Sequence, residues 1–283
     1  MVTLKMPNAV FATGSVNTEF LDTCMSTFSA EVFPLQQRHS INEFVFNNTD
    51  EMIPEILSKD PDGPAVLVNA VFFKGEWTKK FDKTFTKAGE FTPFGELPVH
   101  CRMMSMTDKK TEYKQTKHTE IIKLDYGVSQ QFSAFVALPI GKDMASMDKA
   151  VQELFGSPTS WDKATDNMIQ QNVKLYMPRF TVHKGVDNLK EHMQDMGVTD
   201  IFKDGGLPLM TASSDAYIGD IAHKACIKVN EDGTTAAAAT AVQATRGFCH
   251  INVIKADRPF LFVVLHSTTK TILFVACVNS IGE

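Results

Sequence analysis

The chain has 283 residues, of which 43% are hydrophobic and 22% are charged, and its formal net charge at pH 7 is −5. This balance is ordinary for a globular protein, and the negative charge argues against nucleic acid as a main partner. No apolar run is long enough for a helix that spans a bilayer, and the N-terminus lacks the basic region and apolar block of a signal peptide.

The five cysteines are scattered, odd in number and never spaced as Cys-x-x-Cys. This distribution argues against a disulfide framework and against a structural zinc site. We therefore expect free thiols, no bound metal and no cofactor. The cysteines are Cys24, Cys101, Cys226, Cys249 and Cys277.

No internal repeat, low-complexity tract or linker rich in proline and glycine divides the chain, so we expect one domain over residues 1–283. Residues 4–12 have a strand pattern, and apolar residues at helical spacing predict helices at 18–33 and 41–58. Residues 65–73, AVLVNAVFF, form a nearly continuous apolar run, which is typical of a strand covered on both faces. Asn69 lies in its middle and needs a hydrogen-bond partner if it is buried.

The middle of the chain predicts further strands. Residues 91–106 contain apolar residues and a methionine cluster, which is more often core filler than a binding surface. The apolar residues between Tyr113 and Pro139 indicate two strands, and residues 145–156 have the apolar stripe of a helix. Residues 173–182 alternate as a strand that contains Pro178.

The last third adds a helix and a hairpin. We expect a helix at 186–196, capped by Gly197, and a terminal hairpin made of 255–264 and 270–276.

Residues 228–250 do not have the pattern of a core element. A strand pattern at 226–230 leads into the turn Glu231-Asp232-Gly233, which a run of threonine and alanine and then a polar tip follow. Alanine favours a short helix here, but threonine is a weak helix former and no apolar stripe is present. The alternative is a segment that can become a strand, with one face made of Thr234, Ala236, Ala238, Thr240 and Val242.

Both faces of such a strand would be small, uncharged and free of proline. It could therefore enter the middle of a sheet without burying a charge or losing a backbone donor. Gly233 would act as its hinge, because glycine tolerates a large change of backbone dihedral angles.

At residues 231–241, EDGTTAAAATA, the chain resembles the proximal hinge of the serpins, protease inhibitors that trap their target by inserting a cleaved loop into a sheet. AVLVNAVFFKGEW at 65–77, GVTDIF at 197–202 and ADRPFLF at 256–262 resemble the same family. The resemblance implies an α+β serpin fold, with large, mostly antiparallel sheets, surrounding helices and an exposed reactive-centre loop at 233–250. It covers essentially the whole chain, but the N-terminal helices of a full serpin are absent, as in a fragment or a natural short form.

The resemblance also implies a reactive bond. Spacing counted back from Pro259 places it at Arg246-Gly247, counting forward from Gly233 places it at Gly247, and Phe248 is a third option. Arg246 suits trypsin-like proteases, whose pocket holds a carboxylate, and Phe248 suits chymotrypsin-like ones. The implied function is inhibition of a serine protease, with a trypsin-like target favoured, by a metastable chain that inserts its loop before the acyl-enzyme is hydrolysed.

Four more residues gain roles from the resemblance. Glu231 and Arg179 match an ion pair at the top of the main sheet, near Trp77, which would be worth at most about 1 kcal/mol if it is partly exposed. Asn69 and His223 match the polar centre where the sheet parts. A satisfied core histidine and a gating histidine are compatible roles for His223.

Enzyme activity is not expected. Cys249 and His250 are adjacent on a predicted strand and face opposite sides, and no serine-nucleophile, zinc-protease or phosphate-loop motif is present. The rival functions are a carrier, chaperone or storage protein of the same fold, and an inactive fragment that acts as a peptide-binding sheet. On family grounds we expect an extracellular monomer without a nucleic-acid or membrane partner, and a cytoplasmic location is the alternative.

Overall fold

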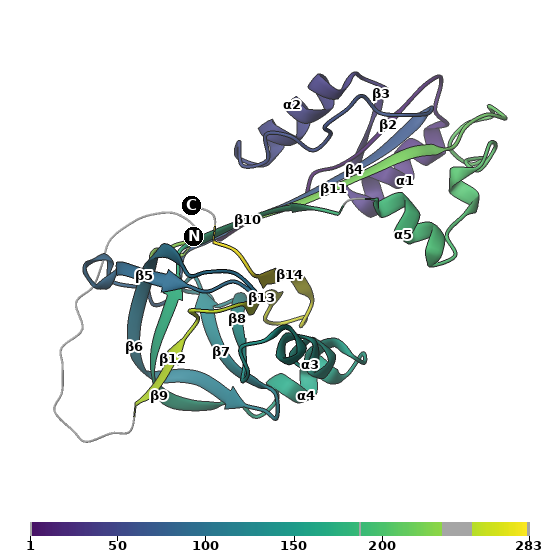
Figure 1. Ribbon diagram of the computed structural model, residues 1–283. Coiled ribbons are helices and arrows are strands. Elements are labelled where there is room, and N and C mark those ends of the chain that lie inside the picture. The colour runs from purple at the N-terminus through teal and green to yellow at the C-terminus, as the bar shows by residue number, and fades with distance from the viewer. Residues whose placement is uncertain (1, 187, 234–250, 282–283) are drawn as a thin grey trace. The chain divides into compact units, whose positions relative to one another are not determined.

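The computed structural model describes residues 2–186, 188–233 and 251–281, and the chain divides into two compact units (Figure 1). The large unit comprises residues 1–3, 74–182 and 228–283, and the small unit comprises residues 4–73 and 183–227. Each unit contains strands and helices, which confirms the predicted α+β class. A single domain over 1–283 stays a prediction.

The large unit is built on an eight-stranded sheet with the order β12-β9-β6-β7-β8-β13-β14, in which β5 pairs with β6. Within the described residues β12 and β9 pair in parallel and the other neighbours are antiparallel, as predicted for the sheets of this chain. Its strands are β5 (Lys87–Phe91), β6 (Val99–Gln115), β7 (Thr119–Tyr126), β8 (Phe132–Pro139), β9 (Ile169–Pro178), β12 (Asn252–Lys255), β13 (Phe260–His266) and β14 (Ile272–Val278).

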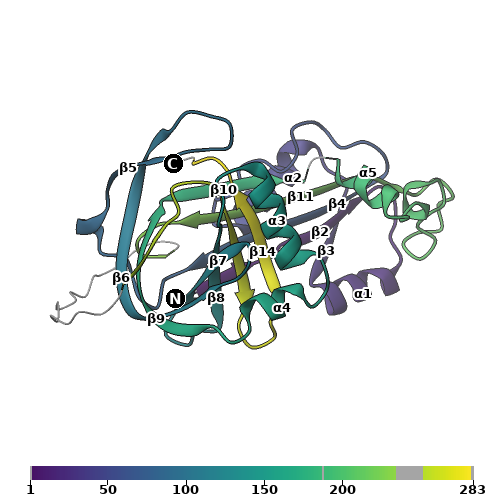
Figure 2. The ribbon, with the colours of Figure 1, turned by 60° about the horizontal axis from the view of Figure 1, so that its bottom comes forward.

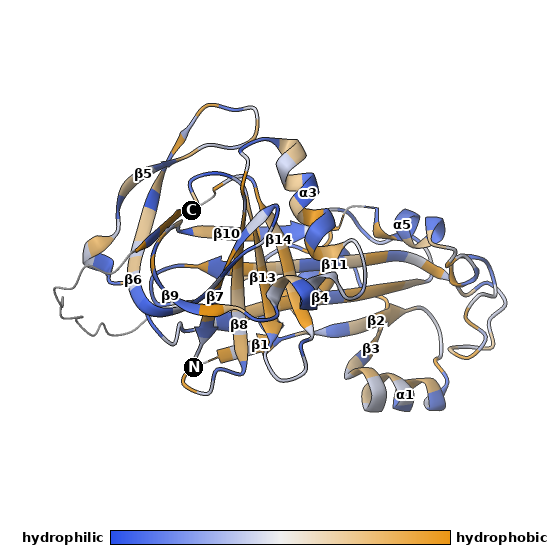
Figure 3. Cartoon of the chain, turned by 90° about the horizontal axis from the view of Figure 1, so that it is seen from below, coloured by the Kyte–Doolittle hydropathy of each residue, from blue (hydrophilic) through white to orange (hydrophobic). Residues whose placement is uncertain are grey.

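Helices α3 (Met144–Phe155) and α4 (Ser160–Thr165) lie against this sheet (Figure 2). Met147 and Leu154 of α3 and Trp161 of α4 share one core cluster with apolar residues of β7, β8 and β13. The α3 helix begins where the Asp143 carboxylate accepts a hydrogen bond of 2.8 Å from the Ser146 backbone. Figure 3 shows α3 with both hydrophilic and hydrophobic residues, as expected for a helix that covers a sheet with one face.

The six-stranded sheet has the order β10-β11-β4-β2-β3, and β1 also pairs with β4. The β11–β4 and β2–β3 pairs are parallel, whereas β2 and β4 are antiparallel. This sheet therefore contains both parallel and antiparallel pairs. Its strands are β1 (Val2–Lys5), β2 (Asn8–Ala12), β3 (Ala30–Pro34), β4 (Ala65–Gly75), β10 (Phe180–Gly185) and β11 (Ile218–Val229).

In the small unit, one face of β4 packs into the hydrophobic core. Its alternate residues Val66, Val68, Ala70 and Phe72 are at most 3% exposed and share a cluster with Ile41 and Val45 of α2. The apolar run at 65–73 is thus a strand, as predicted, but it is buried on one face, and Leu67, Asn69 and Val71 on the other face are only partly buried. The helices of this unit are α1 (Thr18–Phe28), α2 (Arg38–Asn48) and α5 (Leu189–Asp195), and it also contains a short 3-10 helix, η2 (Asp200–Phe202). The other short 3-10 helix, η1 (Lys83–Phe85), belongs to the large unit.

Two predicted helices are shorter in the structure. The helix expected at 18–33 ends at Phe28, because Ser29 has a left-handed backbone with φ of 48° and residues 30–34 form β3. The helix expected at 41–58 ends at Asn48, and Asp50 and Glu51 follow with φ of 52° and 62°. Left-handed residues other than glycine end both helices, so the sequence carried no glycine signal for either end.

The strand predicted at 173–182 is two strands. Pro178 is the last residue of β9, and Phe180 begins β10 in the other sheet. Arg179, between them, donates its backbone N–H to the Arg102 carbonyl at 2.9 Å. The change of sheet places the Arg179 side chain at the end of β11, as described below.

Among the described residues, no helix has the length and apolar character needed to cross a membrane. In the same part of the chain, no group of histidine, cysteine or acidic side chains is arranged to hold a metal ion. The four described cysteines are free thiols.

Candidate functional site

Strand β11 ends in a tight turn at residues 230–233, which we call the hinge turn. The Asn230 N–H donates to the Gly233 carbonyl at 2.9 Å, and the Gly233 N–H donates to the Asn230 carbonyl at 3.1 Å. The Asn230 side-chain oxygen also accepts from the Asp232 N–H at 3.1 Å. The predicted turn at Glu231-Asp232-Gly233 is therefore present, and it is closed by its own backbone.

Gly233 is held against the end of β4. Its φ is +110°, a region that side chains with a Cβ rarely adopt. A Cβ built there would lie 2.2 Å from the Gly75 carbonyl oxygen and 2.5 Å from the Trp77 nitrogen. Both contacts are with backbone atoms, so a larger residue at 233 must move the main chain.

The Glu231 carboxylate is buried in this turn and paired with Arg179. The Glu231 side chain is 1% exposed and that of Arg179 is 37% exposed. The Arg179 Nε donates to both carboxylate oxygens at 2.9 and 2.8 Å, and an Nη donates to one of them at 2.7 Å. The Thr86 hydroxyl donates to the same carboxylate. The structure thus brings together the two residues that the sequence predicted as a pair.

The pair is a stronger constraint than the sequence suggested. Burial raises the pKa of the Glu231 carboxyl, but the hydrogen bonds from Arg179 and Thr86 outweigh burial, so its pKa lies below the ordinary value. Removing one partner of a buried pair leaves an uncompensated charge, which costs about 3–5 kcal/mol, less here because Arg179 is partly exposed. The earlier value of about 1 kcal/mol applies to exposed pairs, and Glu231 is not exposed.

Residues that follow β4 hold the rest of the hinge turn in place through hydrogen bonds and an ion pair. The Trp77 indole Nε1 donates to the Asn230 carbonyl at 2.9 Å, and the Trp77 backbone N–H donates to the Asp232 carbonyl at 3.0 Å. The Trp77 ring stacks on Tyr126 with centroids 4.2 Å apart. Lys83 forms an ion pair of 2.6 Å with Asp232, which is 7% exposed.

Thr86 and Lys83 are site residues that the sequence did not reveal. Both lie in or beside η1, in a segment without a recognisable pattern, and about 150 positions before the turn that they contact. Only the fold brings them to Glu231 and Asp232.

Asn69 and His223 meet in the small unit, where β4 and β11 pair. They are register partners, and His223 Nδ1 lies 2.6 Å from the Asn69 side-chain oxygen. The Asn69 amide nitrogen donates to the Asn8 side chain of β2. The Asn69 oxygen is left to accept, so His223 carries its proton on Nδ1. Asn8 is a third member of this polar centre that the sequence did not indicate.

The stability of the small unit should depend on the charge of His223. Burial lowers the pKa of His223 below its ordinary value of 6.5, so the native state favours the neutral imidazole. The unfolded chain binds a proton more readily, and stability is therefore full above about pH 6.5 and is lost as the pH falls through and below that value. We expect a steeper fall of the melting temperature between about pH 7.5 and pH 5.5 than a His223→Gln variant shows.

The exposed His39 provides the control for this measurement. A His39→Gln variant should follow the wild-type pH dependence. Equal slopes for wild type and His223→Gln would contradict the role given to this histidine.

The remaining predicted site residues lie outside the described residues. They comprise the small-residue face of the segment after Gly233 and the three candidates for the reactive bond. They are Thr234, Ala236, Ala238, Thr240, Arg246, Gly247 and Phe248.

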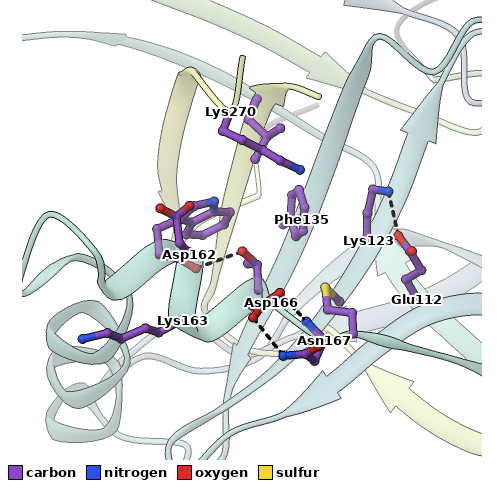
Figure 4. Close-up of a pocket in the computed structure, with 12 residues that line it drawn as sticks. Glu112, Lys123, Phe135, Asp162, Lys163, Asp166, Asn167 and Lys270 are labelled. Carbon is purple, nitrogen blue, oxygen red and sulfur yellow. Dashed lines mark hydrogen bonds and ion pairs between the residues drawn. The ribbon is translucent and has the colours of Figure 1, made fainter. Parts of the chain in front are cut away.

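A cavity of about 450 Å³ in the large unit has no catalytic arrangement (Figure 4). Phe135 and Trp161 contribute its aromatic wall. Lys123 and Glu112 on its rim form an ion pair of 2.6 Å, and Asp166 accepts hydrogen bonds from Asn167. Glu112 thus pairs with Lys123, and Asp166 pairs with Asn167, rather than pointing freely into the cavity.

Comparisons with known proteins concern the chain as a whole. The family model described as "Serpin (serine protease inhibitor)" matches residues 1–281. Leukocyte elastase inhibitor of Xenopus laevis is 31% identical, and the match covers 96% of this chain and 75% of that protein. Serpin B8 of Homo sapiens is 31% identical, with 90% and 71% covered.

Solved structures share the fold. Human thyroxine-binding globulin in complex with thyroxine matches with a TM-score of 0.86 at 24% identity, and the match covers all of this chain and 76% of that one. Tengpin, described as a thermophilic serpin in the native state, matches with a TM-score of 0.84 at 23% identity, with 99% and 74% covered. At these identities the likeness concerns the fold alone.

Proposed function

The chain belongs to the serpin family, and from that premise we propose that it inhibits a trypsin-like serine protease by offering the bond between Arg246 and Gly247 as bait. Relatives that are named as protease inhibitors support inhibition in general. The chain would act as a suicide substrate and supply no catalytic group of its own. The observation that carries the proposal is the hinge turn at the end of β11, beside the parallel β4–β11 pair.

The strand directions support insertion of the loop between β4 and β11. The two strands are parallel, and the bridge between Asn230 and Gly233 is antiparallel, so the chain reverses at the hinge turn. A strand that continues this reversal would run antiparallel to both neighbours. Insertion would replace one parallel pairing by two antiparallel ones, which are slightly more stable per residue. The sheet thus gains stability when the cleaved segment enters it.

The polar centre lies where β4 and β11 would have to separate, and its chemistry fits that role. Insertion between β4 and β11 separates the register partners Asn69 and His223, so their 2.6 Å contact must break. A single neutral hydrogen bond contributes about 0.5–1.5 kcal/mol, which stabilises the closed pair of strands but is small enough to be broken on insertion. After the contact breaks, the polar groups of Asn69 and His223 can form hydrogen bonds with the backbone of the incoming strand. An apolar contact of the same size offers no such groups.

The choice of Arg246 rests on its spacing from Pro259 and on its charge. It is the only lysine or arginine between Gly233 and Ile254. Trypsin-like enzymes bind a basic side chain through a carboxylate in their specificity pocket. Cleavage at Gly247 or after Phe248 is the alternative, and Phe248 would direct the chain to chymotrypsin-like enzymes.

The test is incubation of the purified chain with trypsin and, separately, with chymotrypsin, followed by denaturing electrophoresis and mass spectrometry. We expect a denaturant-resistant complex with trypsin and a released peptide that begins at Gly247. An Arg246→Ala variant should lose the complex with trypsin, whereas a Lys142→Ala variant, changed at an exposed basic residue, should keep it. Cleavage after Arg246 without a complex would instead favour a carrier, chaperone or storage protein of the same fold.

The relatives bear on the location of the chain. Serpin B6, serpin B8 and leukocyte elastase inhibitor are intracellular relatives. Their location supports the cytoplasmic alternative and does not support an extracellular one. We therefore place the proposed activity in the cytoplasm. A monomer that meets its protease through the reactive-centre loop is part of the same proposal.

A further inference from the structure

The outward side of β5, β6, β9 and β12 forms a continuous surface, which we call the β12 face. Register places Tyr176 between Ser105 and Lys255 on neighbouring strands, and all three point outward. The residues next to them along the strands, such as Leu175 and Ile254, are 1% and 2% exposed and point into the core. The alternation defines one buried and one solvent-facing side.

Positive charge gathers on the β12 face around an aromatic ring. The Lys174 Nζ lies 5.2 Å from the centroid of the Tyr176 ring, and the Lys255 Nζ lies 5.7 Å from it. These two residues and Lys87 line a hollow of about 430 Å³. None of the three lysines forms an ion pair with a described residue. Among the described residues, no carboxylate therefore competes with a partner for their ammonium groups by an ion pair.

Exposed apolar side chains lie beside these lysines. Phe85, which lines the hollow, is 59% exposed, and Val253 of β12 is 56% exposed. Aromatic and apolar groups surrounded by charged ones are typical of surfaces that bind another protein. The β12 face has this composition.

The chain connects this face closely to the proposed reactive bond. Asn252, the first residue of β12, lies six positions after Arg246, and six residue steps span at most about 20 Å in any conformation. A domain of about 200 residues has a radius of about 20 Å. A protease whose active site holds the bond therefore extends over the beginning of β12, where Ile254 points into the core and Val253 is exposed.

We infer that the β12 face is a second docking surface for the target protease, and that it binds carboxylates on the rim of the enzyme's active-site cleft. The inference rests on the proposed function, because the protease is placed by the bait. Lys174 and Lys255 would contact the acidic rim, while Tyr176, Phe85 and Val253 would provide the apolar contact. Such contacts raise the rate of association more than the final affinity.

A protein fits this face better than a sulfated polysaccharide does. Glu90 and Asp257 line the same hollow as the three lysines. Two carboxylates in the same hollow as the ammonium groups would repel a polyanion, whereas a protein surface can offer both signs of charge. The polysaccharide is kept as an outcome of the test.

The test measures association with anhydrotrypsin, which binds a substrate loop but cannot cleave it, in its anionic and cationic isoforms. The variant Lys174→Gln/Lys255→Gln is compared with the control Lys117→Gln/Lys149→Gln, which removes two exposed lysines elsewhere in the large unit. With anionic anhydrotrypsin at low ionic strength, we expect the association rate of the first variant to fall about tenfold and that of the control to stay unchanged. High ionic strength should remove the difference. The cationic isoform should show no loss.

Formation of a covalent complex with active trypsin is recorded in parallel. A lysine-dependent rate supports the docking surface even if no covalent complex forms, in which case only the proposed function fails. Equal rates for both variants together with a covalent complex would overturn the docking surface and leave the function intact. Absence of any binding to either isoform would overturn both. Lysine-dependent binding of dextran sulfate, with unchanged association of anhydrotrypsin, would replace the docking surface by a polyanion site.

Discussion

Replacing Thr234 with arginine is expected to convert the chain from an inhibitor of trypsin into a substrate. In the inserted strand Thr234 would share a face with Ala236 and Ala238, next to β4. Alternate residues on one face of β4, such as Val68 and Phe72, are 3% and 2% exposed, so a side chain beside them enters apolar surroundings. An arginine without a partner there costs several kcal/mol.

The size of this cost decides between two competing rates. The acyl-enzyme is either trapped by insertion of the loop or hydrolysed by water. An increase of about 3 kcal/mol in the insertion barrier slows insertion roughly 100-fold, and hydrolysis then prevails. We expect less than about a tenth of the trypsin to be recovered as a denaturant-resistant complex, while cleavage of the loop continues. The measurement is the ratio of complex to cleaved chain on a denaturing gel.

The matched control is Thr268→Arg, at an exposed position in the turn between β13 and β14. It introduces the same side chain away from both the hinge turn and β4, and it should inhibit trypsin as the wild type does. If Thr234→Arg formed the complex as efficiently as Thr268→Arg, insertion of this segment would not be the inhibitory step.

Replacing Gly233 with alanine is expected to lower the free energy of unfolding by about 3 kcal/mol. Two costs add at this position. The φ of +110° is unfavourable for any residue with a Cβ, and the new Cβ would meet the Gly75 carbonyl oxygen at 2.2 Å. Relief requires the hinge turn to move away from the end of β4, which would also strain the hydrogen bonds that Trp77 donates to it.

Gly95→Ala separates the two costs. Gly95 belongs to the same unit and has φ of +70°, but a Cβ there would meet no atom within 4 Å. It should cost only about 1–2 kcal/mol, the penalty for a left-handed backbone. Chemical denaturation of both variants gives the comparison. A Gly233→Ala variant as stable as Gly95→Ala would mean that the turn does not press on β4 as described.

The elements that the sequence predicted well are those with long and unambiguous apolar patterns. The run at 65–73 and the terminal hairpin are present as β4, β13 and β14, because long apolar runs bounded by turns leave few alternatives to a core strand. The two helices that were drawn too long fail at Ser29 and at Asp50, where the backbone turns left-handed without a glycine. Local propensity does not contain that information, because packing of the following segment decides it.

Some residues of the candidate site could likewise be predicted from the sequence, and others could not. Glu231, Arg179 and Trp77 could be placed together because the sequence around each resembles the family, and the structure brings them into contact. Thr86 and Lys83 could not, because a threonine and a lysine in an irregular segment are ordinary surface residues until the fold sets them against the hinge turn. The split of 173–182 at Pro178 was also missed, although it is what carries Arg179 to Glu231.

The position of Trp77 gives the hinge turn a natural optical reporter. The chain has two tryptophans, and Trp161 lies apart from the hinge turn, stacked on Phe155 in the core of α3 and α4. The Trp77 indole donates to the Asn230 carbonyl, so its emission depends on whether that turn is closed. With Trp161 replaced by phenylalanine, stopped-flow fluorescence would follow the opening of the hinge turn in real time, without an attached dye.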